Sequence, residues 1–267
     1  MNFGDPKLEI LQDKPQSEGG AINGEVIAKR LEQRYPDQNG KFSKDQYEEI
    51  DKEMDREMAG GQVELIKKLS SIETPVYLFG GCAYELLLFE RGGEFGGEFA
   101  HPHNDIDVII DRKNLAILEK NLKELGLKPK EVVEGVQNKE ILRYEGGGNG
   151  IKLDLDLALM DINPGTSERY MDIQFGGKKY KVCFSPDILS DKTIVLGGVR
   201  IKTFSPRGLI QSFLFNSQID FALRENDRIR AQRLCEKYFP GETLDSELFK
   251  VRVEEIAFPE KQELTKS

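Results

Sequence analysis

The chain has 267 residues, enough for one large domain or two small ones and long enough to bury a core. Its formal net charge of -9, from 38 Lys and Arg against 47 Asp and Glu, disfavours extended nucleic-acid binding, which requires a basic surface. With 38% hydrophobic residues, no apolar run near the ~20 residues of a membrane span and no charged-then-apolar leader, the sequence predicts a soluble, cytoplasmic protein.

The first region, residues 1–60, differs in composition from the rest. It is polar and carries Gly, Pro and Ser up to residue 22, and it then becomes dense in charged residues with scattered Ile, Leu and Met, as in exposed helices. We interpret it as a charged, partly helical N-terminal appendage. Within it, YPDQNGKFSKDQ resembles a calcium-binding loop, but Tyr35 occupies the first ligand position and Gln46 replaces the bidentate Glu. We therefore expect a solvated turn between two helices.

A pattern of strand, turn, helix and strand starts at residue 74. The segment 75–79 (PVYLF) predicts a short buried strand that Gly80 and Gly81 end, and apolar positions over 82–91 predict a packed helix. Backbone amides of glycines at a helix N-terminus can approach a polyphosphate closely. Gly80 and Gly81 are therefore candidate nucleotide-binding residues.

Two acidic strands follow. In DIDVII the apolar side chains share one face, so Asp105 and Asp107 project together from the other. A glycine-rich hairpin then leads into the alternating strand IKLDLDLAL, which leaves Asp154 and Asp156 together on its polar face. Asp105, Asp107 and a third carboxylate from this strand make the oxygen-rich arrangement that holds one or two Mg²⁺ ions in nucleotidyl-transfer sites.

The remaining chain is predicted to become helical, over 206–224 and 226–239, after further short strands joined by Gly-Gly turns. The predicted fold class is α+β, a small mixed sheet flanked by helices. Residues 61–204 are expected to form the catalytic domain and residues 205–267 a helical C-terminal region.

Three segments, LFGGCAYELLL, HPHNDIDVII and KLDLDLALMD, together resemble the polymerase-beta-type nucleotidyltransferase superfamily. Within it they are similar to the aminoglycoside and lincosamide nucleotidyltransferases of antibiotic resistance. The resemblance covers residues 74–239 and departs from the family where His101 and Pro102 replace a usual basic residue. The Gly-Gly pair of the family matches Gly80 and Gly81, and its His matches His103. Its Asp-x-Asp matches Asp105 and Asp107. Its third Asp matches Asp154, and a later Asp matches Asp161.

The resemblance implies a Mg²⁺-dependent transfer of a nucleoside monophosphate, AMP as the first candidate, from ATP or another nucleoside triphosphate to a hydroxyl of a small molecule. Asp105 and Asp107 would bind the metal while the hydroxyl attacks the α-phosphorus and pyrophosphate leaves. Asp154 would complete the metal site or accept the proton, and Asp156 is a candidate general base or a contact to a cationic acceptor. An aminoglycoside-like acceptor suits the acidic balance of the chain.

The remaining candidates for metal binding are weaker. His101 and His103 are the only histidines, and the three cysteines, Cys82, Cys183 and Cys235, are widely spaced with no CxxC. Neither set forms a zinc or disulfide pattern. We expect His103 to be a structural or phosphate-side partner of the metal-binding strand.

Other functions stay open from the sequence. A tRNA-modifying nucleotidyltransferase usually has Arg-Asp on the helix after the glycines, which is absent here, whereas a protein-modifying adenylyltransferase of the toxin and antitoxin type uses the same core. A non-catalytic scaffold could bind a partner through residues 1–60. The doubled GGEF of residues 92–99 resembles a diguanylate cyclase motif, but each copy is one acidic residue short, so we expect an inserted surface loop.

Overall fold

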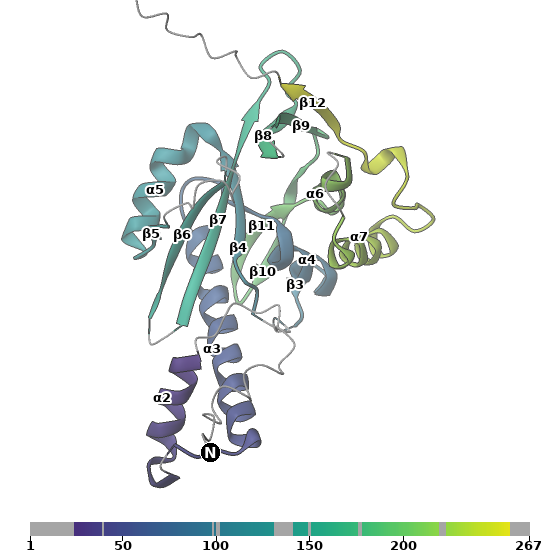
Figure 1. The fold of residues 1–267 in the computed structure, drawn as a ribbon. Coiled ribbons are helices and arrows are strands. Elements are labelled where there is room, and N and C mark those ends of the chain that lie inside the picture. The colour runs from purple at the N-terminus through teal and green to yellow at the C-terminus, as the bar shows by residue number, and fades with distance from the viewer. Residues whose placement is uncertain are drawn as a thin grey trace, which may run out of the picture.

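The computed structural model describes residues 24–38, 40–97, 99, 102–130, 141–148, 151–175, 178–218 and 223–256 (Figure 1). The α-helices in these ranges are α2 (Gly24–Arg34), α3 (Lys44–Ser70), α4 (Gly80–Phe89), α5 (Leu115–Glu124), α6 (Pro206–Gln218) and α7 (Glu225–Tyr238). Short 3-10 helices are η1 (Pro36–Gln38), η2 (Arg112–Asn114) and η3 (Glu247–Phe249). Among the described helices, none combines the length and apolar character that a bilayer span requires.

The strands begin with β1 (Tyr77–Leu78), β2 (Glu90–Arg91), β3 (Glu94–Phe95), β4 (Ile106–Asp111), β5 (Lys128–Pro129) and β6 (Ile141–Gly148). They continue with β7 (Ile151–Ile162), β8 (Arg169–Phe175), β9 (Lys178–Phe184), β10 (Leu189–Leu196), β11 (Val199–Phe204) and β12 (Arg252–Ile256). Across the described residues they form one 12-stranded sheet in the order β12-β9-β8-β7-β4-β1-β11-β10-β3-β2, in which β6 also pairs with β7 and β5 pairs with β6. The expected mixed sheet flanked by helices is confirmed, although it is larger than predicted.

The long strand β7 organises the sheet. It pairs in parallel with β4, antiparallel with β6 through its first part, and antiparallel with β8 at its end. The expected apolar face is present, since Leu155 and Leu157 are fully buried, but Ala158 and Met160 on the opposite face are buried as well. The second half of β7 is therefore buried on both faces, and the polar face is confined to its first half.

The N-terminal region contains two helices that lie side by side and project from the rest of the molecule (Figure 1). Buried apolar side chains of α2 and α3 form a small cluster of their own, made by Ile27, Leu31, Ile50 and Met54. The turn between the helices ends in a capping box, in which Ser43 and Gln46 exchange hydrogen bonds at the start of α3. Gln46, which stands where a calcium-binding loop would have Glu, thus has a capping role.

The helix α3 runs without interruption through residue 60, where we placed the end of the appendage. Its second half packs against β7 and β11 and buries Leu65, Ile66 and Leu69 in the main core. The appendage and the sheet are therefore joined by one continuous helix rather than by a linker.

The C-terminal region is not wholly helical. The two expected helices are present as α6 and α7 and pack against α4, but residues 252–256 form β12, which extends the sheet by pairing with β9. The helix α7 also fixes the end of α4, because Tyr238 Oη and Lys237 Nζ each donate a hydrogen bond to the carbonyl oxygen of Leu87 at 2.7 Å.

The described part of the GGEFGGEF segment is not a plain loop. Gly92 and Gly93, both with positive φ, make the turn of the β2–β3 hairpin, and Glu94 pairs with Val195 at the edge of the sheet. The segment lies between α4 and β4, and its first half forms a hairpin where we expected a plain surface loop, while its status as an insertion stays a prediction.

Candidate active site

The parallel pairing of β4 with β7 brings the predicted carboxylates together. The pairing register places Asp107 beside Asp156, and Asp105 directly precedes β4. Carboxylate oxygens of Asp105, Asp107 and Asp156 all lie within 4.8 Å of one another. Three convergent carboxylates offer the hard oxygen ligands that Mg²⁺ prefers, so the residues present fit a divalent cation.

The electrostatics of this group favour a bound cation. Asp156 is 8% exposed, and burial, followed by repulsion from Asp105, raises its pKa to about 6. Burial raises the pKa of Asp107 well above its usual range, and the charges of Asp105 and Asp156 raise it further. Burial also raises the pKa of Asp105, against the opposing effect of Arg143. The three groups therefore resist being charged together unless a cation joins them.

Asp154 does not join this group, in contrast to the sequence-based expectation. Its Oδ2 lies 3.2 Å from Nζ of Lys130, and its Oδ1 lies 3.6 Å from Nζ of Lys152. Alternation placed Asp154 and Asp156 on the same face, but the pairing with β4 brings Asp156 to Asp107. Of the two residues that this strand offers for the third carboxylate, Asp156 lies in the group, and Asp154 lies close enough for its charge to raise the pKa of Asp105 and of Asp156.

Arg143 is a basic neighbour of the site that the sequence did not reveal. It lies opposite Asp156 in the β6–β7 pairing, and its Nε is 3.2 Å from Oδ2 of Asp156. The sequence contained a usable signal, since a hairpin joined by a short glycine-rich turn fixes which residues of its two strands face each other.

Gly80 and Gly81 begin α4 at the edge of the carboxylate group. Gly80 has φ +62°, and a Cβ built on it would lie 1.9 Å from Oδ2 of Asp107. A Cβ on Gly81 would lie 2.6 Å from Nδ1 of His103. Both positions therefore require glycine, because the helix N-terminus comes into direct contact with Asp107 and His103.

His103 lies between the glycines and several supporting side chains. Its Nε2 is 3.5 Å from Oε1 of Glu85 on α4, and its ring packs edge-on against Phe99 with centroids 5.8 Å apart. Gln62 of α3 forms two hydrogen bonds with the backbone of His103. His101, the other histidine, lies outside the described residues. The contacts of His103 are therefore with α3, α4 and Phe99, and its role as a structural or phosphate-side partner of the metal-binding strand stays a prediction.

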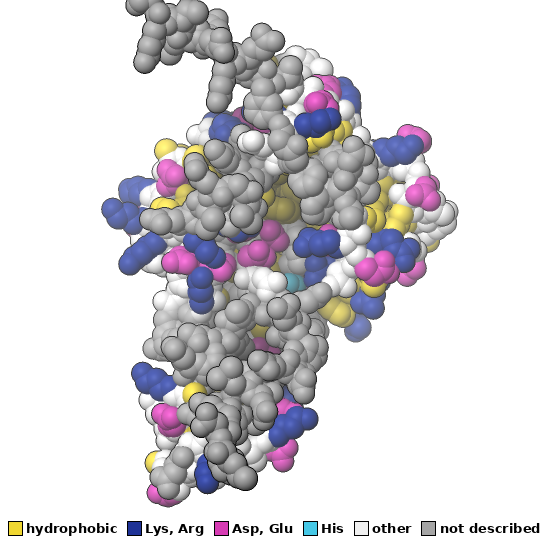
Figure 2. Space-filling model, in the orientation of Figure 1, with side chains coloured by type: hydrophobic (Ala, Val, Ile, Leu, Met, Phe, Trp, Pro, Cys, Tyr) yellow, Lys and Arg dark blue, Asp and Glu magenta, His cyan; other side chains and the backbone are white. Residues whose placement is uncertain are grey.

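The arginines of α7 have separate partners. Arg228 pairs with Glu225 at the surface, and Arg233 donates to Tyr84 Oη at 3.4 Å. Arg230 lies 3.7 Å from the buried Asp227 and lowers the pKa of Asp107, so it contributes positive potential to the site. Figure 2 shows acidic side chains gathered near the middle of one face of the molecule, with Lys and Arg side chains on both sides.

Asp161, the later acidic residue of the resemblance, lies at the far end of β7. Its Oδ2 accepts a hydrogen bond from Nε of Arg112 at 2.8 Å, and it pairs with Tyr170 across the sheet. Asp161 therefore forms a structural ion pair with Arg112 and lies outside the carboxylate group.

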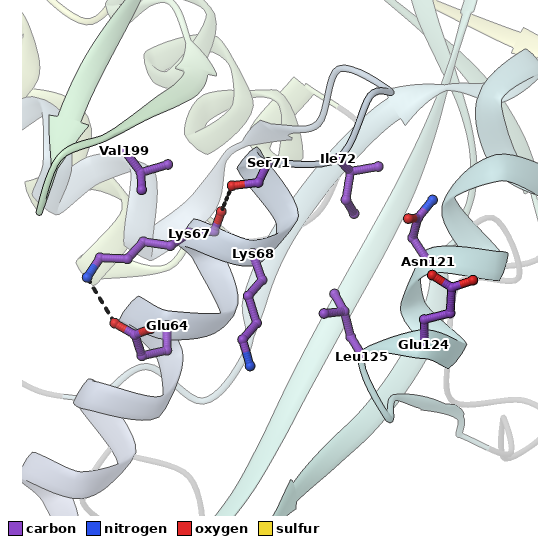
Figure 3. A pocket seen from close by; sticks show the side chains of 9 residues that line it. All are labelled: Glu64, Lys67, Lys68, Ser71, Ile72, Asn121, Glu124, Leu125 and Val199. Carbon is purple, nitrogen blue, oxygen red and sulfur yellow. Dashed lines mark hydrogen bonds and ion pairs between the residues drawn. The ribbon is translucent and has the colours of Figure 1, made fainter.

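A hollow of about 480 Å³ opens between α3 and α5 and shares no residue with the carboxylate group. Figure 3 shows Lys68 of α3 on one side and Asn121 and Glu124 of α5 on the other, while Lys67 points away from α5 and pairs with Glu64. Because its charged side chains are exposed or paired within one helix, it offers no convergent set of groups for catalysis.

Comparisons with known proteins gave structural matches alone, since no family model and no curated protein sequence matches the chain. The antibiotic-resistance factor ANT(2'')-Ia is 16% identical, with a TM-score of 0.45, over 67% of this chain and 85% of its own. The lincosamide antibiotic adenylyltransferase LnuA, solved with lincomycin, is 18% identical, with a TM-score of 0.43, over 67% of this chain and 94% of its own. An antigenic nucleotidyltransferase-like protein from Paracoccidioides brasiliensis is 16% identical, with a TM-score of 0.43, over 72% of this chain and 84% of its own. At TM-scores below 0.5 these similarities do not decide what this chain does, so its function is inferred from its own residues.

Proposed function

We propose that this protein is a Mg²⁺-dependent nucleotidyltransferase that moves a nucleoside monophosphate from a nucleoside triphosphate to a hydroxyl of a small molecule. The observation that carries the proposal is the group of three carboxylates within 4.8 Å of one another, placed against the N-terminus of α4. Carboxylates on one side and helix amides on the other provide the two kinds of contact that a metal-bound triphosphate needs.

Each residue has a role in this proposal. Asp105 and Asp107, with Asp156 beside them, would hold the metal, which when bound neutralises triphosphate charge as a Lewis acid. The amides at Gly80 and Gly81 would contact phosphate oxygens, because no side chain shields them. His103, which contacts the start of α4, would fix the distance between this helix N-terminus and the carboxylate group.

The transfer step follows from the chemistry of the substrates. The oxygen of the acceptor hydroxyl bonds to the α-phosphorus while the bond from that phosphorus to pyrophosphate breaks. We assign the hydroxyl proton to Asp156, which lies beside Asp105 and Asp107 and has a pKa of about 6 in the metal-free protein. Arg143, which contacts Asp156, would keep this carboxylate oriented.

We further propose ATP as the donor and an aminoglycoside-like polyamine alcohol as the acceptor, which would make the protein an antibiotic-modifying enzyme of the cytoplasm. The support is the sequence resemblance described above and the net charge of -9, which favours a cationic substrate. A protein hydroxyl as acceptor, or a scaffold without catalysis, are the alternatives that the experiment must separate.

The first experiment is a calorimetric titration of ATP, GTP, CTP and UTP into the protein, with and without Mg²⁺, repeated on Asp105→Asn. Metal-dependent binding of one nucleotide that is lost in the variant supports the transferase. Pyrophosphate release with an aminoglycoside panel then tests the acceptor, and a mass increase on a co-purified protein would indicate the protein-modifying alternative. Absence of binding for all four nucleotides would favour the scaffold.

A further inference from the structure

We propose that Gln62 is a positioning residue for the nucleotide site, through which the N-terminal helix α3 holds the turn that carries His103 and leads into Asp105. The inference rests on the proposed function, because it assigns Gln62 to the support of that same site. Gln62 lies outside the segments on which the sequence resemblance depends.

The contact between Gln62 and His103 is a matched pair of hydrogen bonds. The Gln62 Nε2 donates to the carbonyl oxygen of His103 at 2.6 Å, and the Gln62 Oε1 accepts from the amide nitrogen of His103 at 3.0 Å. The side chain of Gln62 is 2% exposed although glutamine is usually found at protein surfaces. A buried amide that satisfies both backbone groups of one residue fixes that residue as a paired strand would.

The helix that carries Gln62 is itself well anchored. Leu65, Ile66 and Leu69, within two turns of Gln62, are buried in the main core, and this half of α3 packs against β7 and β11. The amide group is therefore held by a packed helix rather than by a loop, which allows it to define a position for the residue that it binds.

The residue that Gln62 binds faces the glycines of the site. The His103 ring lies where a Cβ on Gly81 would come within 2.6 Å of Nδ1, and it contacts Glu85 of the same helix. Phe99 packs on the ring from the inserted segment. With Gln62 fixing the backbone, the imidazole is directed at the start of α4, and the following residues enter β4 with Asp105 and Asp107 on the side of Asp156.

Loss of the amide should therefore disturb the site without unfolding the domain. Residues that orient metal-binding or nucleotide-binding groups commonly change affinity by about 10-fold to 100-fold when they are replaced. For Gln62→Met, which keeps the length and most of the volume of the side chain, we expect Mg²⁺-dependent nucleotide binding to weaken about 10-fold.

The test combines two measurements on the full chain. Hydrogen exchange at the amide of His103, followed by NMR without metal or nucleotide, reports directly on the hydrogen bond to Gln62. Calorimetric titration of the nucleotide that the wild type binds, in the presence of Mg²⁺, reports on the site. The variants are Gln62→Met, which loses both hydrogen bonds, and Gln62→Glu, which keeps an acceptor for the His103 amide.

A matched control exists elsewhere in the chain. Gln211 on α6 is fully buried, donates to the carbonyl oxygen of Lys250 at 3.0 Å and accepts from Ser185 Oγ at 2.9 Å. The variant Gln211→Met removes a comparable pair of buried hydrogen bonds away from the carboxylates. It should lower stability to a similar degree while nucleotide affinity and His103 amide exchange stay at wild-type values.

The outcomes separate the inference from the proposed function. Faster exchange at His103 with weakened binding in Gln62→Met, and slower exchange in Gln62→Glu than in Gln62→Met, supports the positioning role. Wild-type affinity in Gln62→Met, with or without faster exchange, overturns it, and so does an equal loss of affinity in Gln211→Met. If the wild type binds no nucleotide, the proposed function is wrong and the positioning role falls with it, while the exchange data alone show what holds the turn.

Discussion

Gly80 and Asp107 approach so closely that no side chain could stand between them, since a Cβ built on Gly80 would lie 1.9 Å from Oδ2 of Asp107. The backbone nitrogen of Phe79 also donates to the carbonyl oxygen of Asp107 at 3.1 Å, so the entry to α4 is tied to β4. The glycine has a φ of +62°, which L side chains rarely adopt. This one contact sets the distance between the helix amides and the carboxylate group.

For Gly80→Ala we expect loss of Mg²⁺-dependent nucleotide binding and a decrease in the free energy of unfolding of about 1 to 3 kcal/mol, because the methyl group must displace Asp107 and strain the backbone. Calorimetry and urea unfolding measure the two effects. Gly126→Ala is the control, since Gly126 has φ +80° and a Cβ built on it would meet no atom within 4 Å. Gly126→Ala should lower the free energy of unfolding through backbone strain alone and leave nucleotide binding unchanged. Wild-type nucleotide binding by Gly80→Ala would contradict the proposed role of the α4 N-terminus.

For Asp107→Asn we expect loss of nucleotidyl transfer without loss of folding. The pKa of Asp107 is raised by burial and by Asp105 and Asp156, so its negative charge costs stability in the metal-free protein. The midpoint of urea unfolding without metal should therefore equal or exceed that of the wild type. A variant that retains full transfer activity would remove Asp107 from the proposed site.

Asp154→Asn and Asp156→Asn should behave differently although the two residues share a face of β7. Asp156 belongs to the carboxylate group, so its replacement should weaken Mg²⁺-dependent binding at least about 10-fold. Asp154 lies with Lys130 and Lys152, partly exposed ion pairs that contribute little, so binding should change by less than about 3-fold. The reverse order of effects would restore Asp154 as the third carboxylate.

In the metal-free protein, the contribution of Asp156 to stability should fall as pH rises from about 4 to about 7. The pKa of Asp156 is raised from 3.8 to about 6 in the folded state, so the folded state holds the proton more tightly than the unfolded chain. Its contribution to stability is then fully present below pH 3.8 and is lost as pH rises through about 6. Urea unfolding of wild type and Asp156→Asn across this range measures the effect, and the variant should show the shallower dependence.

The ionisation of the carboxylate group also predicts how the stabilisation of the protein by Mg²⁺ depends on pH. Binding requires ionised carboxylates, so saturating Mg²⁺ should raise the midpoint of unfolding more at pH 7.5 than at pH 5. If Mg²⁺ raised the midpoint of unfolding equally at both pH values, the metal would bind outside the carboxylate group.

Periodicity predicted the two strands of the site but not their register. The alternation in DIDVII and in KLDLDLAL indicated which side chains share a face, and both polar faces are found where expected. The choice between Asp154 and Asp156 depends on how β7 aligns with β4, and that alignment is set by pairing between segments about fifty residues apart. No local pattern carries this information.

The elements that sequence reasoning missed depend on tertiary contacts. The strands β3 and β12 are short and polar, and each exists because an edge strand, β10 or β9, offers free backbone groups to it. Gln62 likewise gives no signal on a charged helix, since its burial follows from the approach of the His103 turn. When a polar residue is buried by a segment that is distant in the chain, no local sequence pattern predicts that burial.

For Leu31→Ala we expect local rather than global destabilisation. Leu31 is fully buried in the small cluster between α2 and α3, apart from the main core. Removing its side chain should cost about 2 to 5 kcal/mol through lost burial and a residual cavity. Because the cluster is separate, hydrogen exchange should accelerate at the amides of α2 and of the first half of α3 while the amides of β4 and β7 keep their protection.

Leu118→Ala provides the comparison, since Leu118 is equally buried but lies in the main core. It should reduce protection throughout β4 and β7, because the sheet and its helices unfold as one unit. If Leu31→Ala instead reduced protection in β4 and β7 as much as Leu118→Ala does, the helix pair would have to fold together with the sheet. The continuous helix α3 would then transmit stability from the N-terminal cluster to Gln62, and a partner binding to α2 would stabilise the turn at His103.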